Sequence, residues 1–350
     1  MSLGRSDVNP DAANIYDRTP LSLAAENGDE EVVGMLLRRD DVNPNTVDTL
    51  SGQTPLSWAA QDGHEGVVRM LLGRDDTNPD IADNCGRTPL SFAAEGGHAA
   101  VMRILLGRND VCPNTADTFF GQTPLMFAAE KGREGAVRML LGRNDINPDI
   151  ADKYGRTPLS RAAQNGHDGV VRTLVGRSDV NLEAAADEYS QTPLLWAAEN
   201  GHDGVVRILL ERNDVNPNTA DVHGRTPLLW AARNGYERVV RILLERNDVN
   251  PYTSDEYGRT SVSWAMQNGH GRIVILLLRR QNDVPLNTPI ISSQASLSWE
   301  AQSEDEGTIE LPRDPADFIP RYASSLQPTD PFSPEPPEPP EPPFKRARRS

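Results

Sequence analysis

The dipeptide Thr-Pro recurs along this 350-residue chain at a nearly constant spacing, and an eighth copy reads Thr260-Ser261. The steps between copies alternate between 35 and 34 residues, with a last step of 34. A period of this length indicates a stack of supersecondary units, each of which buries its apolar face only against its neighbours. The seven Thr-Pro copies begin at Thr19, Thr54, Thr88, Thr123, Thr157, Thr192 and Thr226.

One unit, residues 83–114, shows how the first half of each repeat is expected to fold. A turn signal precedes Thr88, whose side-chain oxygen suits the N-cap of a helix. Pro89 suits the first helical position because the N–H group that it lacks has no partner there. A narrow stripe of Leu and small Ala side chains then lets another helix come close, and Gly97 is expected to end this short helix.

A second helix is expected to run back antiparallel to the first. Asn109 tolerates the left-handed conformation and is expected to close this helix, and Pro113 keeps the following chain extended. Each repeat is therefore predicted to be a helix–turn–helix unit. The apolar stripe of the second helix is formed by Val101, Met102, Leu105 and Leu106.

The full pattern of a repeat reads Asp-x-x-Gly-Arg-Thr-Pro-Leu-Ser-x-Ala-Ala, then Gly-His, then Val-Val-Arg-x-Leu-Leu. This pattern resembles the ankyrin repeat, and the resemblance covers the first four-fifths of the chain. It implies an all-α solenoid of helix–turn–helix units joined by β-hairpin-like fingers. Two-helix repeats of the tetratricopeptide type have a similar length but lack the turn and the Thr-Pro-Leu opening.

The chain departs from the ankyrin pattern directly after Thr-Pro-Leu, where the family usually has His. We expect the side-chain hydrogen bond of that His to be absent, which would loosen single repeats without changing the fold. The position holds Ser22, Ser57, Ser91, Met126, Ser160, Leu195, Leu229 and Ser263.

The alternation of the period has a definite place in the repeat. Residues 44–54 form a segment one residue longer than residues 79–88, and 113–123 is one residue longer than 148–157. This alternation indicates that the array arose by duplication of a two-repeat block, in which every second finger carries one extra residue.

The sequence predicts three regions. Residues 1–283 form the array, which begins within a repeat, and we expect the chain to be a truncated product or a part of a longer protein. Residues 284–303 are interpreted as a decayed ninth repeat that caps the array, with a plain linker as the alternative. Residues 304–350 are expected to be a disordered tail, because Pro and Glu dominate there and few residues can form a core.

The tail ends in a short basic cluster. The preceding Pro-Glu-Pro-Pro run is expected to form a polyproline II rod. The cluster resembles a nuclear import signal, and importin is its expected partner. Its basic residues are Lys345, Arg346, Arg348 and Arg349.

Composition limits the partners that we expect. The net charge of −16 disfavours nucleic acid, because the phosphates would repel the array. Two cysteines, Cys85 and Cys112, provide no disulfide framework and favour a reducing compartment. The longest apolar run, residues 273–278, is too short to span a bilayer. We therefore expect a soluble, monomeric, intracellular protein of the cytoplasm or nucleus that binds no membrane.

Five of the six histidines share one repeat position, directly after the Gly that ends the first helix. Successive copies stand a whole repeat apart, so they cannot converge on one metal ion, and we interpret them as structural. No catalytic residue, metal site or cofactor is predicted, because the chain shows no phosphate-binding glycine loop and no nucleophile–base pair outside the repeat pattern. The five histidines are His64, His98, His167, His202 and His270.

Five arginines each follow an acidic residue by four positions, which predicts ion pairs along a solvated helix face. The position before each Ala-Ala pair is usually aromatic, and the resulting row is expected to pack repeat against repeat. Arg161 interrupts this row, and we expect it either to stack on a neighbouring ring or to contact a partner. The aromatic row consists of Trp58, Phe92, Phe127, Trp196, Trp230 and Trp264, with Trp299 beyond the last full repeat.

The fingertips vary from repeat to repeat beside an Asp that recurs eight times. Their large apolar side chains form either a contact strip for a partner or a cover over adjacent fingers. In ankyrin proteins the concave face, made of fingertips and first helices, is the usual binding surface. The residues predicted to bind a partner are Tyr16, Leu50, Phe119, Phe120, Tyr154, Arg161, Tyr189, His223, Arg233 and Tyr257.

The leading functional hypothesis is a non-enzymatic scaffold that binds a protein or an extended peptide on the concave face. Eight repeats at the ~8–10 Å spacing of packed helices would offer a surface on the order of 70 Å long. The alternative is that the array is the sensor or regulatory arm of a larger signalling protein, such as a NACHT-type ATPase. The start of the chain within a repeat motivates that alternative.

Overall fold

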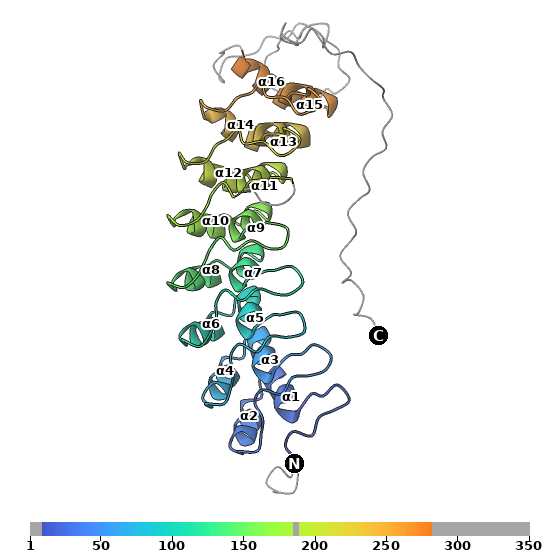
Figure 1. The fold of residues 1–350 in the computed structure, drawn as a ribbon. Helices are drawn as coiled ribbons and strands as arrows, with labels where there is room; N and C mark the ends of the chain where they lie inside the picture. Colours follow the sequence, from blue (N-terminus) through green and yellow to red (C-terminus); the bar gives the residue numbers. More distant parts are fainter. Residues whose placement is uncertain (1–8, 185–188, 282–350) are drawn as a thin grey trace, which may run out of the picture. The chain divides into compact units, whose positions relative to one another are not determined.

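The computed structural model describes residues 9–184 and 189–281, and within them the chain forms sixteen helices in eight successive pairs (Figure 1). The predicted all-α repeat architecture is confirmed. The first helices of the pairs are α1 Pro20–Glu26, α3 Pro55–Asp62, α5 Pro89–Gly96, α7 Pro124–Glu130, α9 Pro158–Gln164, α11 Pro193–Glu199, α13 Pro227–Asn234 and α15 Ser261–Gln267. The second helices are α2 Glu30–Leu37, α4 Glu65–Leu71, α6 Ala99–Leu106, α8 Glu134–Leu141, α10 Asp168–Val175, α12 Asp203–Leu210, α14 Glu237–Glu245 and α16 Gly271–Gln281.

Each helix packs onto the equivalent helices of the neighbouring repeats. The first helices contact one another in order from α1 to α15, and the second helices form a row beside them from α2 to α16 (Figure 1). In α3 the side chains of Leu56, Ala59 and Ala60 are fully buried. Because the two Ala side chains are small, neighbouring first helices approach closely, and the predicted apolar stripe is confirmed.

The predicted helix start is confirmed in all eight first helices. A Thr side-chain oxygen accepts a hydrogen bond from the backbone N–H three residues later, as between Thr88 and Ser91 or between Thr123 and Met126. In seven of these helices Pro follows as the first helical residue, whereas α15 begins with Ser261. The repeated Thr-Pro pair therefore sets where each repeat enters its first helix.

Serine makes its own hydrogen bond where the family pattern has His. The hydroxyl oxygens of Ser57 and Thr54 lie 3.0 Å apart, and Ser160 accepts a bond of 2.8 Å from the backbone N–H of Thr157. In three repeats the position is apolar and buried instead, as at Met126. The bond of the family's His is absent because no His stands there, but in the serine repeats the hydroxyl is close enough to bond the N-cap residue in its place.

The second helices do not end as the sequence suggested. Gly97 closes the first helix α5 in the left-handed conformation with φ 75°, as predicted. The prediction that Asn109 closes α6 in that conformation is wrong, because Asp17 and Ser190 are the non-glycine residues with positive φ in the described part of the chain. The C-cap of α6 is Gly107 in a right-handed helical conformation.

An Arg-x-Asp fork follows the second helices, and sequence analysis missed it. In the fork of Arg143, Nε and Nη2 donate to the two carboxylate oxygens of Asp145, at 2.8 and 2.6 Å. Nη1 of Arg143 also donates to the backbone carbonyls of Leu106 and Arg108 in the preceding repeat. Each such fork lowers the pKa of its Asp carboxyl, and most of them join consecutive repeats. The same fork forms at Arg39, Arg74, Arg108, Arg177, Arg212 and Arg246.

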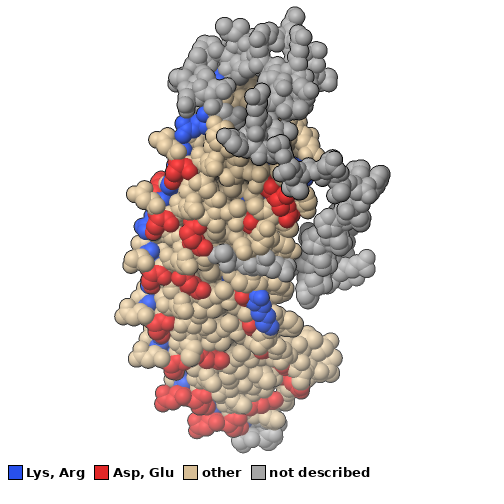
Figure 2. All heavy atoms as spheres, turned by 45° about the horizontal axis from the view of Figure 1, so that its top comes forward, with Lys and Arg blue, Asp and Glu red and all other residues tan. Residues whose placement is uncertain are grey.

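Charged side chains recur along the side of the array where the even-numbered helices lie. Figure 2 shows acidic and basic groups following one another down that edge, with uncharged residues over much of the remaining visible surface. The predicted pairs form where the acid is Glu, as between Glu65 and Arg69. Within the described residues the predicted pairs starting at Asp168 and Asp203 are not formed, because Asp is one methylene shorter and does not reach the next turn.

A row of amide and carboxylate side chains joins the connectors between repeats. Asn114 accepts from the backbone N–H of Asn147 through Oδ1 and donates through Nδ2 to the carbonyl of Asp145. Asp149, at the equivalent position one repeat later, accepts from the N–H of Asn181 through Oδ2. Within the described residues its buried Oδ1 has no hydrogen-bond partner, and the same holds for Oδ1 of Asp11 and Asp80.

Replacing Asp149 with Asn is expected to raise the free energy of unfolding by about 1 kcal/mol at pH 7. Burial and the nearby Asp179 raise the pKa of Asp149, so its charged form is unfavourable there despite the bond from Asn181. An amide nitrogen in place of the unpartnered Oδ1 can donate to a backbone carbonyl, as Asn114 does. Urea denaturation followed by circular dichroism measures the change.

The reciprocal substitution, Asn114→Asp, is the matched control. This substitution is expected to lower the free energy of unfolding. A carboxylate has no N–H group, so the backbone carbonyl of Asp145 would lose the hydrogen bond that Asn114 donates. If Asp149→Asn left the unfolding midpoint unchanged or lowered it, the idea that an amide at position 149 can bond as Asn114 does would be wrong.

Several predictions concern residues outside the described part of the chain. They include the decayed ninth repeat at 284–303, the tail at 304–350 and the basic cluster within that tail. The array reaches α16, whose Ile273 and Leu277 are buried. In the described ranges no helix has the length and apolar character needed to cross a membrane.

Candidate protein-interaction surface

Five of the fingers in the described part of the chain are built around a buried carboxylate. Asp117 accepts backbone N–H groups of Phe119 and Phe120 through Oδ1, at 2.8 and 2.7 Å, and that of Gln122 through Oδ2, at 2.7 Å. Such side-chain bonds to nearby backbone N–H groups fold the chain into a tight turn. Equivalent buried residues are Asp48, Asp152, Asp221 and Asp255. The recurring Asp of the fingers is therefore the residue that shapes them.

The hydrogen bonds outweigh the burial of these carboxylates. Burial raises the pKa of Asp255, but the hydrogen bonds that Arg259 and Trp264 donate lower it by more. The net pKa of Asp255 therefore lies below the ordinary value. The pKa of Asp48 is lowered in the same way, with Ser51, Gln53 and Trp58 as donors. The carboxylates of Asp48 and Asp255 are thus charged at neutral pH and hold their donors strongly.

The extra residue of alternate fingers lies where the sequence placed it. The backbone N–H of Asp48 bonds the carbonyl of Gln53, five residues on, whereas that of Asp83 bonds Arg87, four residues on. Fingers are formed mainly by turns, and an isolated β-bridge joins Ser254 to Thr260.

In the described part of the chain, backbone hydrogen bonds link most fingers to the next. The carbonyl of Tyr16 accepts from the N–H of Thr49 at 3.1 Å, and that of Phe120 accepts from Lys153 at 2.7 Å. Similar bonds are accepted by the backbone carbonyls of Ser51, Cys85, Tyr189 and His223 from N–H groups of the next finger. The tips therefore stand at a spacing that the backbone sets.

The predicted contact residues at the tips are exposed to solvent. Phe120 and Tyr154 have ring centroids 6.4 Å apart, so these two rings partly cover each other. His223 is half-buried, and its Nδ1 lies 2.7 Å from a carboxylate oxygen of Glu256. The exposed fractions run from 46% to 75% at Tyr16, Leu50, Phe119, Phe120, Tyr154, Tyr189 and Tyr257.

The aromatic row of the first helices lies against arginines from the finger bases. The guanidinium carbon of Arg87 is 4.1 Å from the ring centroid of Phe92 and 4.5 Å from that of Phe127, one repeat later. Arg18 covers Trp58 of the next repeat in the same manner. The row therefore joins consecutive repeats as expected, with a cation between the rings.

The tryptophans also bond the finger carboxylates. Nε1 of Trp230 donates to Asp221 and Nε1 of Trp264 donates to Asp255, both at 3.1 Å. One carboxylate thus organises a fingertip and positions an aromatic ring of the adjoining first helix. Asp187, the recurring Asp of the finger before Trp196, lies outside the described residues. Fingertips and first helices form one continuous surface, which we call the finger face.

A family model described as Ankyrin repeats (3 copies) matches seven overlapping stretches of the chain, which together run from residue 3 to residue 288. The chain belongs to the ankyrin repeat family. No curated protein matches it. Ankyrin repeats are typically protein–protein interaction modules and are usually not catalytic. The matched stretches are residues 3–82, 21–117, 74–152, 109–184, 135–221, 177–253 and 213–288.

The histidines of these ankyrin repeats connect neighbouring units. Nε2 of His64 lies 2.9 Å from the backbone carbonyl oxygen of Glu26, one repeat earlier, and four other histidines make the same contact. Where Tyr236 replaces His, the amide of Asn234 donates to the carbonyl of Glu199 instead. The described residues contain no cluster of three or more His, Cys, Asp or Glu suited to a metal ion.

The two arginines that we singled out on the first helices have different surroundings. Arg161 lies 3.0 Å from Asp152 and 3.7 Å from Glu130, so carboxylates rather than rings hold its guanidinium. Arg233 lies between two tryptophan rings, with its guanidinium carbon 5.0 Å from the centroid of Trp230 and 4.6 Å from that of Trp264. Arg161 therefore replaces an aromatic residue by an ion pair, whereas Arg233 adds a cation to the aromatic row.

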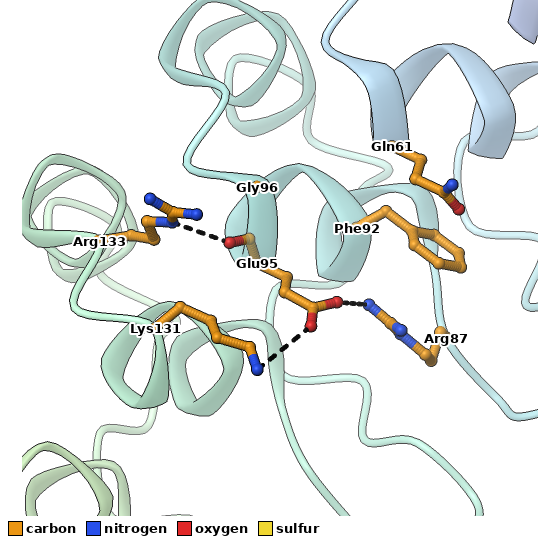
Figure 3. Close-up of a pocket in the computed structure, with 7 residues that line it drawn as sticks. All are labelled: Gln61, Arg87, Phe92, Glu95, Gly96, Lys131 and Arg133. Carbon is orange, nitrogen blue, oxygen red and sulfur yellow. Dashed lines mark hydrogen bonds and ion pairs between the residues drawn. The ribbon is translucent and has the colours of Figure 1, made fainter. Parts of the chain in front are cut away.

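A shallow hollow on the finger face was not anticipated from the sequence. Arg87, Glu95, Lys131 and Arg133 line it together with Phe92, Gln61 and Gly96 (Figure 3). Glu95 pairs with Arg87 and lies 3.8 Å from Lys131, while its backbone carbonyl accepts from Nε of Arg133 at 3.0 Å. Arg133 takes the position of the connecting histidines, so most polar groups of this hollow already serve the contact between repeats.

Proposed function

We propose that this ankyrin array is a non-enzymatic scaffold that binds a protein or an extended peptide on its finger face. The observation that carries the proposal is the strip of exposed apolar tips, held at a regular spacing by hydrogen bonds between fingers. Rigid aromatic side chains bury much area on contact and lose little conformational entropy, which suits them to be binding hot spots.

The proposed contact residues divide into two groups. Tyr16, Leu50, Tyr189 and Tyr257 would contribute apolar area along the strip, together with Phe119, Phe120 and Tyr154 at its centre. His223 and Arg233 would contribute polar contacts. Arg161 would act mainly by supporting the surface, because two carboxylates already bind its guanidinium.

Replacing Phe119, Phe120 and Tyr154 with Ala is expected to abolish capture of the partner. These rings are exposed, so their loss should leave the fold and the melting temperature nearly unchanged. Affinity purification of the tagged full chain, followed by mass spectrometry, measures which proteins are lost. Met35→Ala, an exposed residue on the second-helix side, is the matched control. A triple variant that retained every partner of the wild type would contradict the proposal.

We also infer that Lys345, Arg346, Arg348 and Arg349 act as a nuclear import signal recognised by importin. The support is the density of basic residues in an otherwise acidic, Pro-rich segment. Replacing all four with Ala is expected to exclude a fluorescently tagged full chain from nuclei. Replacing Glu335, Glu338 and Glu341 with Ala is the control, and an unaltered distribution of the basic-cluster variant would disprove the signal.

A further inference from the structure

Arg233 stands at a repeat position that is otherwise Glu or Gln. It lies in the last turn of α13, where the equivalent residues of the other first helices are Glu26, Gln61, Glu95, Glu130, Gln164, Glu199 and Gln267. Several of these residues bond the side chain eight positions earlier, as Glu95 bonds Arg87 and Glu199 bonds Gln191. In the seventh repeat the same two positions hold Arg225 and Arg233, which repel each other.

Three guanidinium groups and two indole rings alternate around this position. Arg225 lies over Trp230 at 4.3 Å, Arg233 contacts both indoles, and Arg259 lies over Trp264 at 4.0 Å. We call these five residues the Arg–Trp cluster. The cluster belongs to the finger face of the seventh and eighth repeats, because α13 and α15 carry both indoles.

Two of the three arginines in the cluster form ion pairs with carboxylates. Arg225 pairs with Asp221 at 2.7 Å, and Arg259 pairs with Asp255 at 2.8 Å. Among residues 9–184 and 189–281, no carboxylate oxygen lies within 4 Å of the guanidinium nitrogens of Arg233. By contrast, Arg18, Arg87, Arg156 and Arg161 of the same face are all paired with carboxylates.

The surroundings of Arg233 make its charge unfavourable in the free protein. Burial lowers the pKa of its guanidinium, and the positive charges of Arg225 and Arg259 lower it further, against the weaker opposing effect of Glu199 and Asp255. A half-buried cation that is repelled by its neighbours gains when an anion pairs with it. A guanidinium is planar and matches the two oxygens of a carboxylate.

We propose that Arg233 binds a carboxylate side chain of an extended acidic segment in the protein partner, with Trp230 and Trp264 providing apolar walls beside it. The inference rests on the proposed binding at the finger face and adds the chemistry of the partner. One guanidinium that has no carboxylate partner in the described part of the chain matches one monoanionic carboxylate. A dianionic phosphate would be repelled more strongly by Glu199, Asp221 and Asp255, which lie around the cluster.

The test uses the full chain and three labelled peptides, measured by fluorescence anisotropy at physiological salt. The peptides are an amidated (Glu-Gly-Leu)4, its Gln counterpart and a phosphoserine counterpart. The wild type is expected to bind the Glu peptide more tightly than the other two. Arg233→Gln should weaken binding of the Glu peptide roughly 10-fold or more, because a charge-assisted bidentate contact is lost.

Arg241→Gln is the matched control, since it removes the same charge from the outer surface of the same repeat. It should leave the peptide affinity within about 2-fold of the wild type, because exposed charges at a distance are screened. Thermal unfolding by circular dichroism establishes that both variants are folded. Equal losses in the two variants, or equal binding of the Glu and Gln peptides, would overturn the proposal.

Three further outcomes separate this inference from its alternatives. Tighter binding of the phosphoserine peptide would identify a phosphate-binding site instead. A gain in affinity on replacing Glu335, Glu338 and Glu341 with Gln would make the chain's own tail the resident segment, in place of a partner. If the fingertip variant lost the captured partner and Arg233→Gln kept it, the acidic-segment inference would fail while the proposed function stood.

Discussion

Replacing Leu209 with Ala is expected to lower the free energy of unfolding by about 2–5 kcal/mol. Leu209 lies in α12 and is fully buried, and α12 contacts α10 and α14 on either side. The substitution would remove three carbon atoms from a close-packed row and leave a cavity that rigid neighbouring helices cannot fill. Leu243 occupies the equivalent place in α14, is also fully buried, and should respond alike.

The double variant should do more than add two cavities. Each repeat is stabilised chiefly by its neighbours, so two weakened interfaces in succession can uncouple the ends of the array. Urea denaturation followed by circular dichroism should show a lower midpoint and a broader transition. Leu50→Ala, at an exposed fingertip, is the control and should change little. An unchanged melting curve for the double variant would mean that the assigned helix register is wrong.

Replacing Arg143 with Met is expected to destabilise the array by about 2–3 kcal/mol. Met keeps much of the apolar stem but has no donors for Asp145 or for the carbonyls of Leu106 and Arg108. The side chain of Arg143 is 18% exposed, so water replaces these bonds poorly. Denaturation at equilibrium measures the loss.

Arg212→Met is the matched control for this prediction. Arg212 makes the same fork to Asp214, but its side chain is 43% exposed and, in the described part of the chain, no backbone carbonyl of the preceding repeat accepts a bond from it. We expect a loss of less than about 1 kcal/mol, as for other exposed ion pairs. Similar losses at the two positions would show that the carbonyl contacts between repeats contribute little.

Much of the fold could be read from local sequence signals. The Thr-Pro pairs located the start of the first helices, and Gly97 and its equivalents marked their ends. The extra residue of alternate fingers was also placed correctly, between Asp48 and Gln53. These features depend on interactions within a few residues of the chain, which is why the pattern predicts them.

Contacts between repeats were predicted less well. The Arg-x-Asp spacing recurs as regularly as Thr-Pro, and an exposed ion pair could have been inferred from it. The sequence does not show that Nη1 of Arg143 reaches carbonyls 35 and 37 residues earlier, because that depends on how closely two repeats stack. Asn109, where the predicted closure failed, lies between the two members of such a fork, Arg108 and Asp110.

For the candidate site, too, the local features were predicted from the sequence and the contacts between repeats were not. The pattern of apolar residues beside a recurring Asp was enough to predict which residues lie at the fingertips. It did not predict whether their rings are covered, because exposure depends on the distance to the next finger, which backbone bonds between fingers set. Likewise, the sequence did not show that carboxylates hold Arg161 whereas Arg233 lies between two rings.

Sequence alone determined the repeat, its two helices and the position of each fingertip, because capping, turn and periodicity signals are local. Only the tertiary structure decided which charges are balanced. Arg161 stands beside Asp152 and Glu130, whereas Arg233 lies between two indoles with cations on both sides. Charge balance also depends on groups from neighbouring repeats, such as Glu130 beside Arg161 and Arg259 near Arg233, which only the stacking of the repeats brings together.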